Sequence, residues 1–305
     1  MSWKRSVSVR RTWWVLLLGI LLSAAISILF LIFLRQQEKM NIERIRTIYA
    51  ERTENLINSM FHKTDVLAAA VKMENGDVSE ETFNMLARLV YQKDSGIRGI
   101  QYMPGAIVTY SYPVEGNEGV MGKNFLEIPE RRKDVMLAID TKSIALSGPY
   151  NLIQGGLGVV ARNPIFLQDA AGKEYFWGFS AIILNLPDAL TSAGLGRLSE
   201  EGYDFQLFCI NENKERLVIA GNASLDVSGA ECGTIEVPHH EWTLAIASLH
   251  PWQKFAEALF VFGICFLLTA VLWKLAYAVM KEKDAVQAKD RFFSDISHDM
   301  RTPLN

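Results

Sequence analysis

Two long apolar stretches, one near each end of the chain, constrain this sequence most. The first runs from Thr12 to Leu34, and the second from about Phe255 to Met280 with Glu257 and Lys274 near its ends. A helix of about 20 apolar residues crosses a hydrocarbon layer about 30 Å thick. We therefore predict transmembrane helices at 12–34 and 254–280. A cleaved signal peptide is the alternative for the first stretch, and a buried helix of a globular domain for the second.

The basic residues ahead of the first stretch predict the orientation. Residues 1–11 contain Lys4, Arg5, Arg10 and Arg11 and no acidic residue, and such segments stay in the cytoplasm. Two spans then bring both termini to the cytoplasm. The expected product is a multi-pass protein of the inner (plasma) membrane. Residues from about 35 to 253 would lie in the periplasm or outside the cell, and they are numerous enough to fold on their own.

Charge, cysteine and histidine content argue against three kinds of site. The chain has 31 Lys plus Arg against 34 Asp plus Glu, so no cationic field favours nucleic acid, and we predict no direct nucleic-acid partner. The cysteines Cys209, Cys232 and Cys265 lack the C-x-x-C spacing of zinc or redox sites. Cys209 and Cys232 fit either a disulfide or two thiols. His239 and His240 would point to opposite faces of a strand, so we predict no metal site.

The segment between the spans is predicted to be α+β: a long stalk helix (35–75) followed by two PAS-like mixed α/β sensor lobes. Its element order of strand, strand, helix and strands favours an antiparallel sheet over alternating parallel β-α units. We assign 76–186 to a membrane-distal lobe and 187–253 to a smaller membrane-proximal lobe. A cytoplasmic helix begins in 281–305. Helices are expected after Ser79, after Pro129 and around 188–198, a hairpin turn at Asn211–Asn213, and strands at 99–102, 106–112, 158–166, 175–184, 203–210, 216–220, 234–237 and 243–248.

The stretch from Ser147 to Gly158 has the composition of a pocket wall. Its glycines let a ligand or another strand approach the backbone. A glycine-rich β-turn explains the same residues equally well. The polar side chains that would contact a ligand here are Ser147, Tyr150, Asn151 and Gln154.

A family resemblance is carried by four separated sequence blocks, GIQY, VTYSYPVEGNEGVMGKNFLEIPERR, IALSGPYNLIQGGLGVVARNPIF and WGFSAIIL. In this order they resemble the CHASE domain of bacterial and plant sensory receptors, over about residues 76–186. The resemblance implies an extracytoplasmic sensor of a small molecule. In the plant members, which are more distant, the ligands are adenine-type cytokinins, and the positions of an acidic and a hydroxyl pocket residue fall near Asn124 and Ser147. An amide at 124 cannot supply the carboxylate, which is a departure from the cytokinin pattern.

The last residues, FFSDISHDMRTPLN from Phe292 to Asn305, resemble the H-box of sensor histidine kinases. The resemblance implies that His298 is the phosphoacceptor and that Asp299 orients the imidazole and acts as its acid/base. A neutral imidazole, with an ordinary pKa of about 6.5, is a good nucleophile near neutral pH. ATP and Mg would be bound by a catalytic domain absent from these residues, so we expect the sensing half of a longer kinase.

Apolar residues every seven positions predict the assembly of this C-terminal helix. Val279, Val286, Phe293 and Met300 form such a series, which favours a homodimer. As a two-component receptor, the protein would pass its phosphoryl group to a receiver domain or response regulator. Two other functions compete with this one: a CHASE-linked diguanylate cyclase-type receptor and a membrane-tethered extracytoplasmic binding protein.

Overall fold

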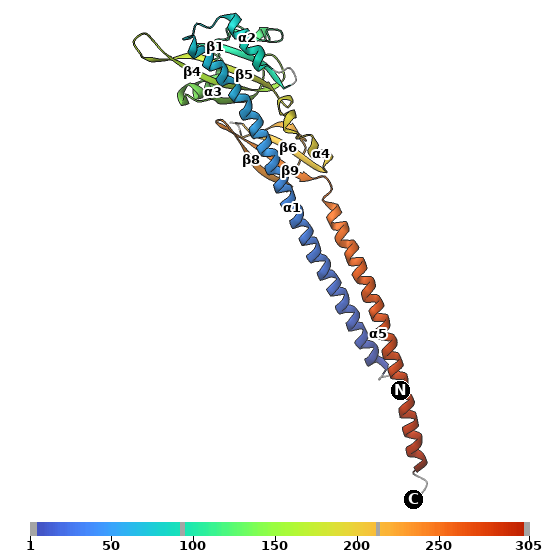
Figure 1. Cartoon of the computed structure of the whole chain (residues 1–305). Coiled ribbons are helices and arrows are strands. Elements are labelled where there is room, and N and C mark those ends of the chain that lie inside the picture. Colours follow the sequence, from blue (N-terminus) through green and yellow to red (C-terminus); the bar gives the residue numbers. More distant parts are fainter. Residues whose placement is uncertain (1–4, 92–94, 212–213, 302–305) are drawn as a thin grey trace. The chain divides into compact units, whose positions relative to one another are not determined.

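The computed structural model of the chain describes residues 5–91, 95–211 and 214–301; for 5–11, 295 and 297–301 it describes the backbone alone. It divides into two compact units (Figure 1). We call Met1–Lys39 with His250–Asn305 the helical unit, and Met40–Leu249 the α+β unit. Helix α1 (Arg5–Met73) runs through both units without a break, and α5 (Trp252–Arg301) belongs to the helical unit.

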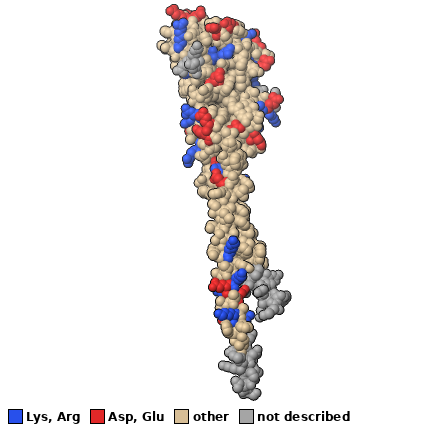
Figure 2. All heavy atoms as spheres, turned by 90° about the vertical axis from the view of Figure 1, so that its right-hand side faces the viewer, with Lys and Arg blue, Asp and Glu red and all other residues tan. Residues whose placement is uncertain are grey.

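The helical unit contains the two predicted membrane spans. Both of its helices are long and apolar enough to cross a membrane by length and composition. Figure 2 shows a band on their surface without Lys, Arg, Asp or Glu. The interior of a bilayer excludes charge, because a charged group there loses its hydration. Two apolar helices therefore flank the α+β unit in the sequence, as expected of an inner-membrane protein.

Small residues bring α1 and α5 together inside the helical unit. A Cβ atom on Gly19 would lie 2.2 Å from the Thr269 methyl carbon, so only glycine fits. The hydroxyl oxygens of Ser23 and Thr269 are 3.3 Å apart, and the rings of Trp13 and Trp273 are 5.7 Å apart. Close backbone approach and hydroxyl contacts are what hold helices together in lipid, where no hydrophobic force acts between them.

The first sheet of the α+β unit is antiparallel throughout, as the sequence predicts, with strand order β2-β1-β5-β4-β3. Strand β3 was missed by the sequence analysis, because Gly148 and Pro149 break its apolar pattern where the register shifts. Strand β2 is shorter than the predicted 106–112, because Ala106 has a φ of 68° and turns the chain. The strands are β1 (Ile97–Pro104), β2 (Tyr110–Tyr112), β3 (Ala145–Asn151), β4 (Leu157–Gln168) and β5 (Glu174–Asn185).

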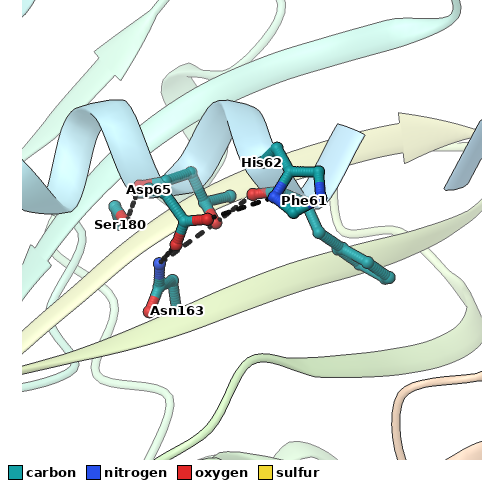
Figure 3. Close-up of polar contacts among 6 residues, drawn as sticks. Phe61, His62, Asp65, Asn163 and Ser180 are labelled. Atoms are coloured by element: carbon teal, nitrogen blue, oxygen red, sulfur yellow. Dashed lines mark hydrogen bonds and ion pairs between the residues drawn. The ribbon is translucent and has the colours of Figure 1, made fainter. Parts of the chain in front are cut away.

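Helix α1 covers one face of this sheet and is hydrogen-bonded to it (Figure 3). The Tyr102 hydroxyl donates to the Leu67 carbonyl at 2.7 Å, and the Ser180 hydroxyl donates to the Thr64 carbonyl at 3.0 Å. The Asn163 amide donates to an Asp65 carboxylate oxygen at 2.9 Å. These bonds come from three neighbouring strands, so they fix the helix to the sheet and not to a single loop.

Two shorter helices form where the sequence predicts them. Helix α2 (Glu80–Val90) begins at Ser79, whose hydroxyl accepts from the Thr82 backbone N–H. Helix α3 (Pro129–Thr141) begins at its proline, which has no N–H to leave unpaired. It buries Val135 and Ala138 against the sheet face opposite α1. A short 3₁₀ turn, η1 (Glu118–Val120), lies in the chain between β2 and α3.

The second sheet has four antiparallel strands in the order β7-β6-β9-β8. His239, with a φ of 66°, lies in the tight turn before β9, not in an extended strand as assumed above. Of the predicted turn, Asn211 donates its N–H to the Glu215 carbonyl, while residues 212 and 213 lie outside the described chain. Cys209 and Cys232 are free thiols. The elements are η2 (Asp188–Ala193), α4 (Arg197–Glu200), β6 (Tyr203–Ile210), β7 (Arg216–Gly221), η3 (Val227–Gly229), β8 (Glu231–Val237) and β9 (His240–Ser248).

Helix α1 also packs on the second sheet, at an earlier part of its length. Arg46 donates to the Cys232 carbonyl at 2.6 Å, and Asn41 donates to the Tyr203 hydroxyl at 2.7 Å. A Cβ atom on Gly233 would lie 2.6 Å from the Arg46 Nε, so glycine makes room for this contact. Both lobes are therefore attached to one helix.

Candidate functional site

Polar side chains gather on the face of the first sheet that α1 does not cover. Gln101 on β1 pairs with Ala181 on β5, and Ala181 pairs with Arg162 on β4. Residues directly opposite one another across strands point to the same face. Only the small Ala181 side chain lies between Gln101 and Arg162 in this row. In the neighbouring row, Ser147 pairs with Val160.

A small cavity lies over this face, under α3 and the β3–β4 turn. Its volume is about 20 Å³, which is room for about one water molecule. Its walls are apolar apart from two arginines, two glutamines and a tyrosine. The lining residues are Gln101, Met103, Phe125, Arg131, Tyr150, Leu152, Ile153, Gln154, Val160, Arg162 and Ile183.

Buried hydrogen-bond donors at this face have no protein partner. Arg162 is 1% exposed, and its Nε and Nη1 atoms make no hydrogen bond. The same is true of the Gln101 side-chain nitrogen and of the Ser147 hydroxyl. Each unpaired buried donor costs about 1–3 kcal/mol, and a charged donor costs more. Several unpaired buried donors at one place are expected where a bound molecule accepts their hydrogen bonds.

The α3 side of the cavity is held by Tyr150 on β3. Its hydroxyl donates to the Asp134 carboxylate, and the Arg131 guanidinium carbon lies 3.5 Å from the centre of its ring. Burial raises the pKa of Tyr150 to about 12 and lowers the pKa of Arg162. For Arg162, the nearby Tyr150 and Asp134 oppose the effect of burial. Tyr150 therefore stays a neutral hydrogen-bond donor at physiological pH.

The opposite side of the cavity is tied to the loop after β2. Arg98 donates to the Gln154 carbonyl at 2.6 Å, and the Gln154 amide donates to the Asn117 side-chain oxygen at 3.2 Å. Asn117 in turn donates to the Arg98 carbonyl at 3.2 Å. These bonds hold the tip of the β3–β4 turn over the cavity, and they fix the direction in which Gln154 points.

The structure brings together three of the five residues that the sequence assigned to ligand binding. Tyr150 and Gln154 line the cavity, and Ser147 lies on the same face in the next row. Asn124 lies elsewhere, in the turn before α3, where its side chain bonds Glu127 and the Leu126 N–H. Asn151 is exposed, and its carbonyl accepts a hydrogen bond from Arg131.

The sequence analysis missed Arg162 and Gln101, the residues with the strongest unmet hydrogen bonding. A signal for Arg162 was present, since it stands alone as a charge within the apolar strand LGVVARNPIF. Arginine is almost never fully buried unless it is paired. For Gln101 no comparable signal exists, because an uncharged amide within a strand fits either face.

A wider cleft lies between α3 and the second sheet, next to the cavity. Its volume is about 1070 Å³. Arg131 and Tyr150 line both spaces, so the two are separated by these side chains. His239 and His240 line the cleft, yet no group of three His, Cys, Asp or Glu residues in the described chain has a geometry suited to a metal ion.

Residues 104–219 match the CHASE domain. The matched segment begins within the predicted block 76–186 and continues beyond it into β6 and β7, so the match includes strands of both sheets. It contains Arg162 and the β3–β4 turn. The match supports an extracellular sensor receptor, and no curated protein matches the chain.

Solved structures resemble the chain in fold. An extracellular ligand binding receptor from Desulfohalobium retbaense DSM5692 superposes with a TM-score of 0.51 at 13% sequence identity, over 68% of this chain and 40% of that one. This chain thus spans less than half of that receptor's length. Two structures of the Vibrio cholerae LuxQ periplasmic domain give TM-scores of 0.37 and 0.36 at 13% and 10% identity, over 68% of this chain and 98% and 99% of theirs.

The predicted phosphoacceptor lies far along the chain from the cavity. The backbone of His298 and Asp299 is helical, in the last turns of α5, and their side chains lie outside the described part. Helix α5 begins four residues after β9 ends at Ser248. The helix that would contain the phosphoacceptor is thus joined to the second sheet by a short connection.

Proposed function

We propose that this chain is the sensing portion of a transmembrane two-component receptor, in which a small extracytoplasmic ligand controls ATP-dependent autophosphorylation of His298. The observation that supports the sensing role best is the two-sided first sheet. One face holds unpaired donors over a cavity, and the other face is hydrogen-bonded to α1. A ligand bound on one face would thereby act on a helix that leads into the membrane.

Neighbouring residues along the same strands connect the two faces. Gln101 lines the cavity, and the next residue, Tyr102, bonds α1. Arg162 lines the cavity, and Asn163 bonds Asp65 of α1. Successive side chains of a strand point to opposite faces. A shift of these strands on ligand binding would therefore move the α1 anchors together.

The output side of the proposal is supported by the H-box resemblance. His298 would attack the γ-phosphorus of ATP, forming an N–P bond as ADP leaves, while Asp299 holds the other ring nitrogen. ATP and Mg would be bound by a catalytic domain outside these residues. We further propose a homodimer, with a receiver domain or response regulator accepting the phosphoryl group.

The first experiment asks whether His298 is phosphorylated. The full-length receptor, in membrane vesicles with radiolabelled ATP, should acquire an acid-labile phosphoryl group. His298→Gln should abolish the label, while His62→Gln, which changes an exposed histidine of α1, should keep it. Label that persists in His298→Gln would reject the proposal, and so would the absence of label in the unaltered receptor.

The second experiment separates a receptor from a membrane-tethered binding protein. One to four alanines are inserted after Lys283 in α5, where each residue rotates the following helix by about 100°. If the helix transmits the signal as a rigid element, phosphorylation should rise and fall with insertion length. Output that is unaffected by insertion length would exclude rigid coupling through α5.

A further inference from the structure

We propose that the cavity binds a small monocarboxylate with a short apolar body, whose carboxylate accepts hydrogen bonds from Arg162. The inference names the ligand class of the sensor site proposed above and rests on that function only for its biological meaning. It follows from three features of the cavity: donors without hydrogen bonds, the charge of the nearby residues, and apolar walls.

The buried polar groups of the site that lack a hydrogen-bond partner are donors. Arg162 offers two unpaired nitrogens, Gln101 offers its amide N–H₂, and the Ser147 hydroxyl lies in the neighbouring row. A guanidinium accepts nothing, so the atom that completes it has to be an acceptor. Hydrogen bonds between a guanidinium and a carboxylate are short and roughly twice as strong as neutral ones. A carboxylate therefore suits this group better than an alcohol or an amine does.

The charges around the cavity leave room for a single negative charge. Arg131 and Arg162 line it, and the nearby Asp134 carboxylate accepts the Tyr150 hydroxyl. The two guanidinium groups of the lining and the Asp134 carboxylate sum to one positive charge, and Arg98 adds a cation at the turn, on the Gln154 carbonyl. A monoanion balances this charge, whereas a dicarboxylate or a phosphate dianion would bring excess negative charge close to Asp134. The charge balance therefore favours a monocarboxylate.

The remaining walls are apolar and select the rest of the ligand. Met103, Leu152, Val160 and Ile183 line the cavity, and the Phe125 ring lies 5.3 Å from the Arg162 guanidinium carbon. Apolar walls around a few fixed polar groups are typical of small-molecule sites. An alkyl group would gain from contact with these side chains, while a second polar group on the ligand would lose its hydration without a partner.

The cavity has to widen to admit such a molecule, because it holds about one water. The β3–β4 turn is the segment that would have to move, and its movement would break the hydrogen bonds of Gln154 with Arg98 and Asn117. Gly155 and Gly156 have no atom within 4 Å of a Cβ position, and Ile153 is 45% exposed. Outward movement of this turn would enlarge the cavity without disturbing the sheet, where Arg162 and Gln101 are fixed.

The test compares carboxylates with their neutral amides on the 305-residue chain in lipid nanodiscs, by isothermal titration calorimetry. The probes are propionate, butyrate and 2-methylpropionate, each beside its amide, with succinate and inorganic phosphate as further arms. At least one monocarboxylate should bind, and its amide should bind at least about 30-fold more weakly, since each charged hydrogen bond contributes about 1.5–3 kcal/mol.

Arg162→Met should weaken binding of that monocarboxylate by about 100-fold or more, and Arg162→Lys by less, because lysine keeps the charge. Arg88→Met removes an exposed arginine of α2 and should leave the affinity unchanged. Gln101→Met provides a second variant, expected to weaken binding about 10-fold, in case Arg162→Met does not fold. Far-ultraviolet circular dichroism identifies variants that fold.

Several outcomes would overturn the inference: no monocarboxylate binds, the amides bind as tightly, Arg162→Met binds normally, or only succinate or phosphate binds. The calorimetric result does not depend on kinase output. Binding that leaves His298 phosphorylation unchanged would reject the proposed function and keep the ligand class. Ligand-dependent phosphorylation without carboxylate binding would do the reverse.

Discussion

The two sheets of the α+β unit share α1 as a packing partner but treat buried polar groups in different ways. In the first sheet, Arg162 and Gln101 are buried with donors unpaired. In the second, the buried Gln206 donates to the Asn222 carbonyl at 2.7 Å and accepts from Arg216 at 3.3 Å. Among the described residues of this sheet, the indole N–H of Trp242 makes no hydrogen bond, but it is a neutral donor within an apolar cluster.

If the first sheet binds a ligand as we propose, this difference is the one between a recognition surface and a structural surface. A sheet that only has to fold satisfies its buried amides, because unpaired ones are destabilising. A sheet that has to bind a ligand keeps buried donors unpaired, and it is less stable in the ligand-free state than in the ligand-bound state. Ligand binding should therefore stabilise the first lobe, and that gain is the free energy available to move α1.

The largest effect is expected in the second sheet. Trp242 is fully buried among apolar side chains, so Trp242→Ala should lower the free energy of unfolding by about 3–5 kcal/mol. Ile153→Ala, in the exposed cavity turn, should change it by less than about 0.5 kcal/mol. Urea denaturation in detergent measures both. Equal losses would show that the two lobes do not differ as described.

The next largest effect is expected from two substitutions that should change the free energy of unfolding in opposite directions. Arg162→Met should stabilise the ligand-free chain by about 1–3 kcal/mol, because it removes a buried charge with unpaired nitrogens. Gln206→Met should destabilise by about 1 kcal/mol, because it removes the two hydrogen bonds that the buried Gln206 amide makes with the Asn222 carbonyl and Arg216. The midpoints of denaturation compare them. If Arg162→Met destabilises as much as Gln206→Met, Arg162 is a structural residue.

Two serines of the first sheet allow a matched comparison of its faces. Both are fully buried, but Ser180 bonds the Thr64 carbonyl, while the Ser147 hydroxyl lies beside Tyr150 without a hydrogen bond of normal geometry. Ser180→Ala should lower stability by about 1 kcal/mol, and Ser147→Ala by less than about 0.5 kcal/mol. Thermal unfolding at fixed lipid composition resolves this difference. A larger loss at Ser147 would show that its hydroxyl is already bonded.

The last prediction concerns pH. Burial raises the pKa of Tyr150 to about 12, so the stabilisation that Tyr150 gives is complete below its ordinary pKa of about 10 and is lost as the pH rises toward 12. The stability of the unaltered chain relative to Tyr150→Phe should therefore fall between pH 10 and 12. Other groups titrate equally in the two proteins, so their contributions cancel when the stability of Tyr150→Phe is subtracted from that of the unaltered chain. A constant difference would mean that the Tyr150 hydroxyl is solvated.

The sequence predicted the elements well and the site in part. The two spans and the strands of the second lobe follow from uncharged length and alternation, which are local properties. Tyr150 and Gln154 were included in the candidate site because glycine and polar residues cluster along the chain, and both line the cavity. Arg162 and Gln101 were missed because they become neighbours only through the register of β1 and β4, which both pair with β5. No local sequence pattern predicts that pairing.

The row Gln101, Ala181, Arg162 and Ala145 across the first sheet also bears on how such a receptor changes its preferences. Two methyl groups flank the guanidinium, and Ala181 is fully buried between Gln101 and Arg162. A laboratory series at Ala181 from alanine through valine to leucine would therefore push these two side chains apart step by step, and it would measure how strongly the proposed ligand selectivity depends on their spacing.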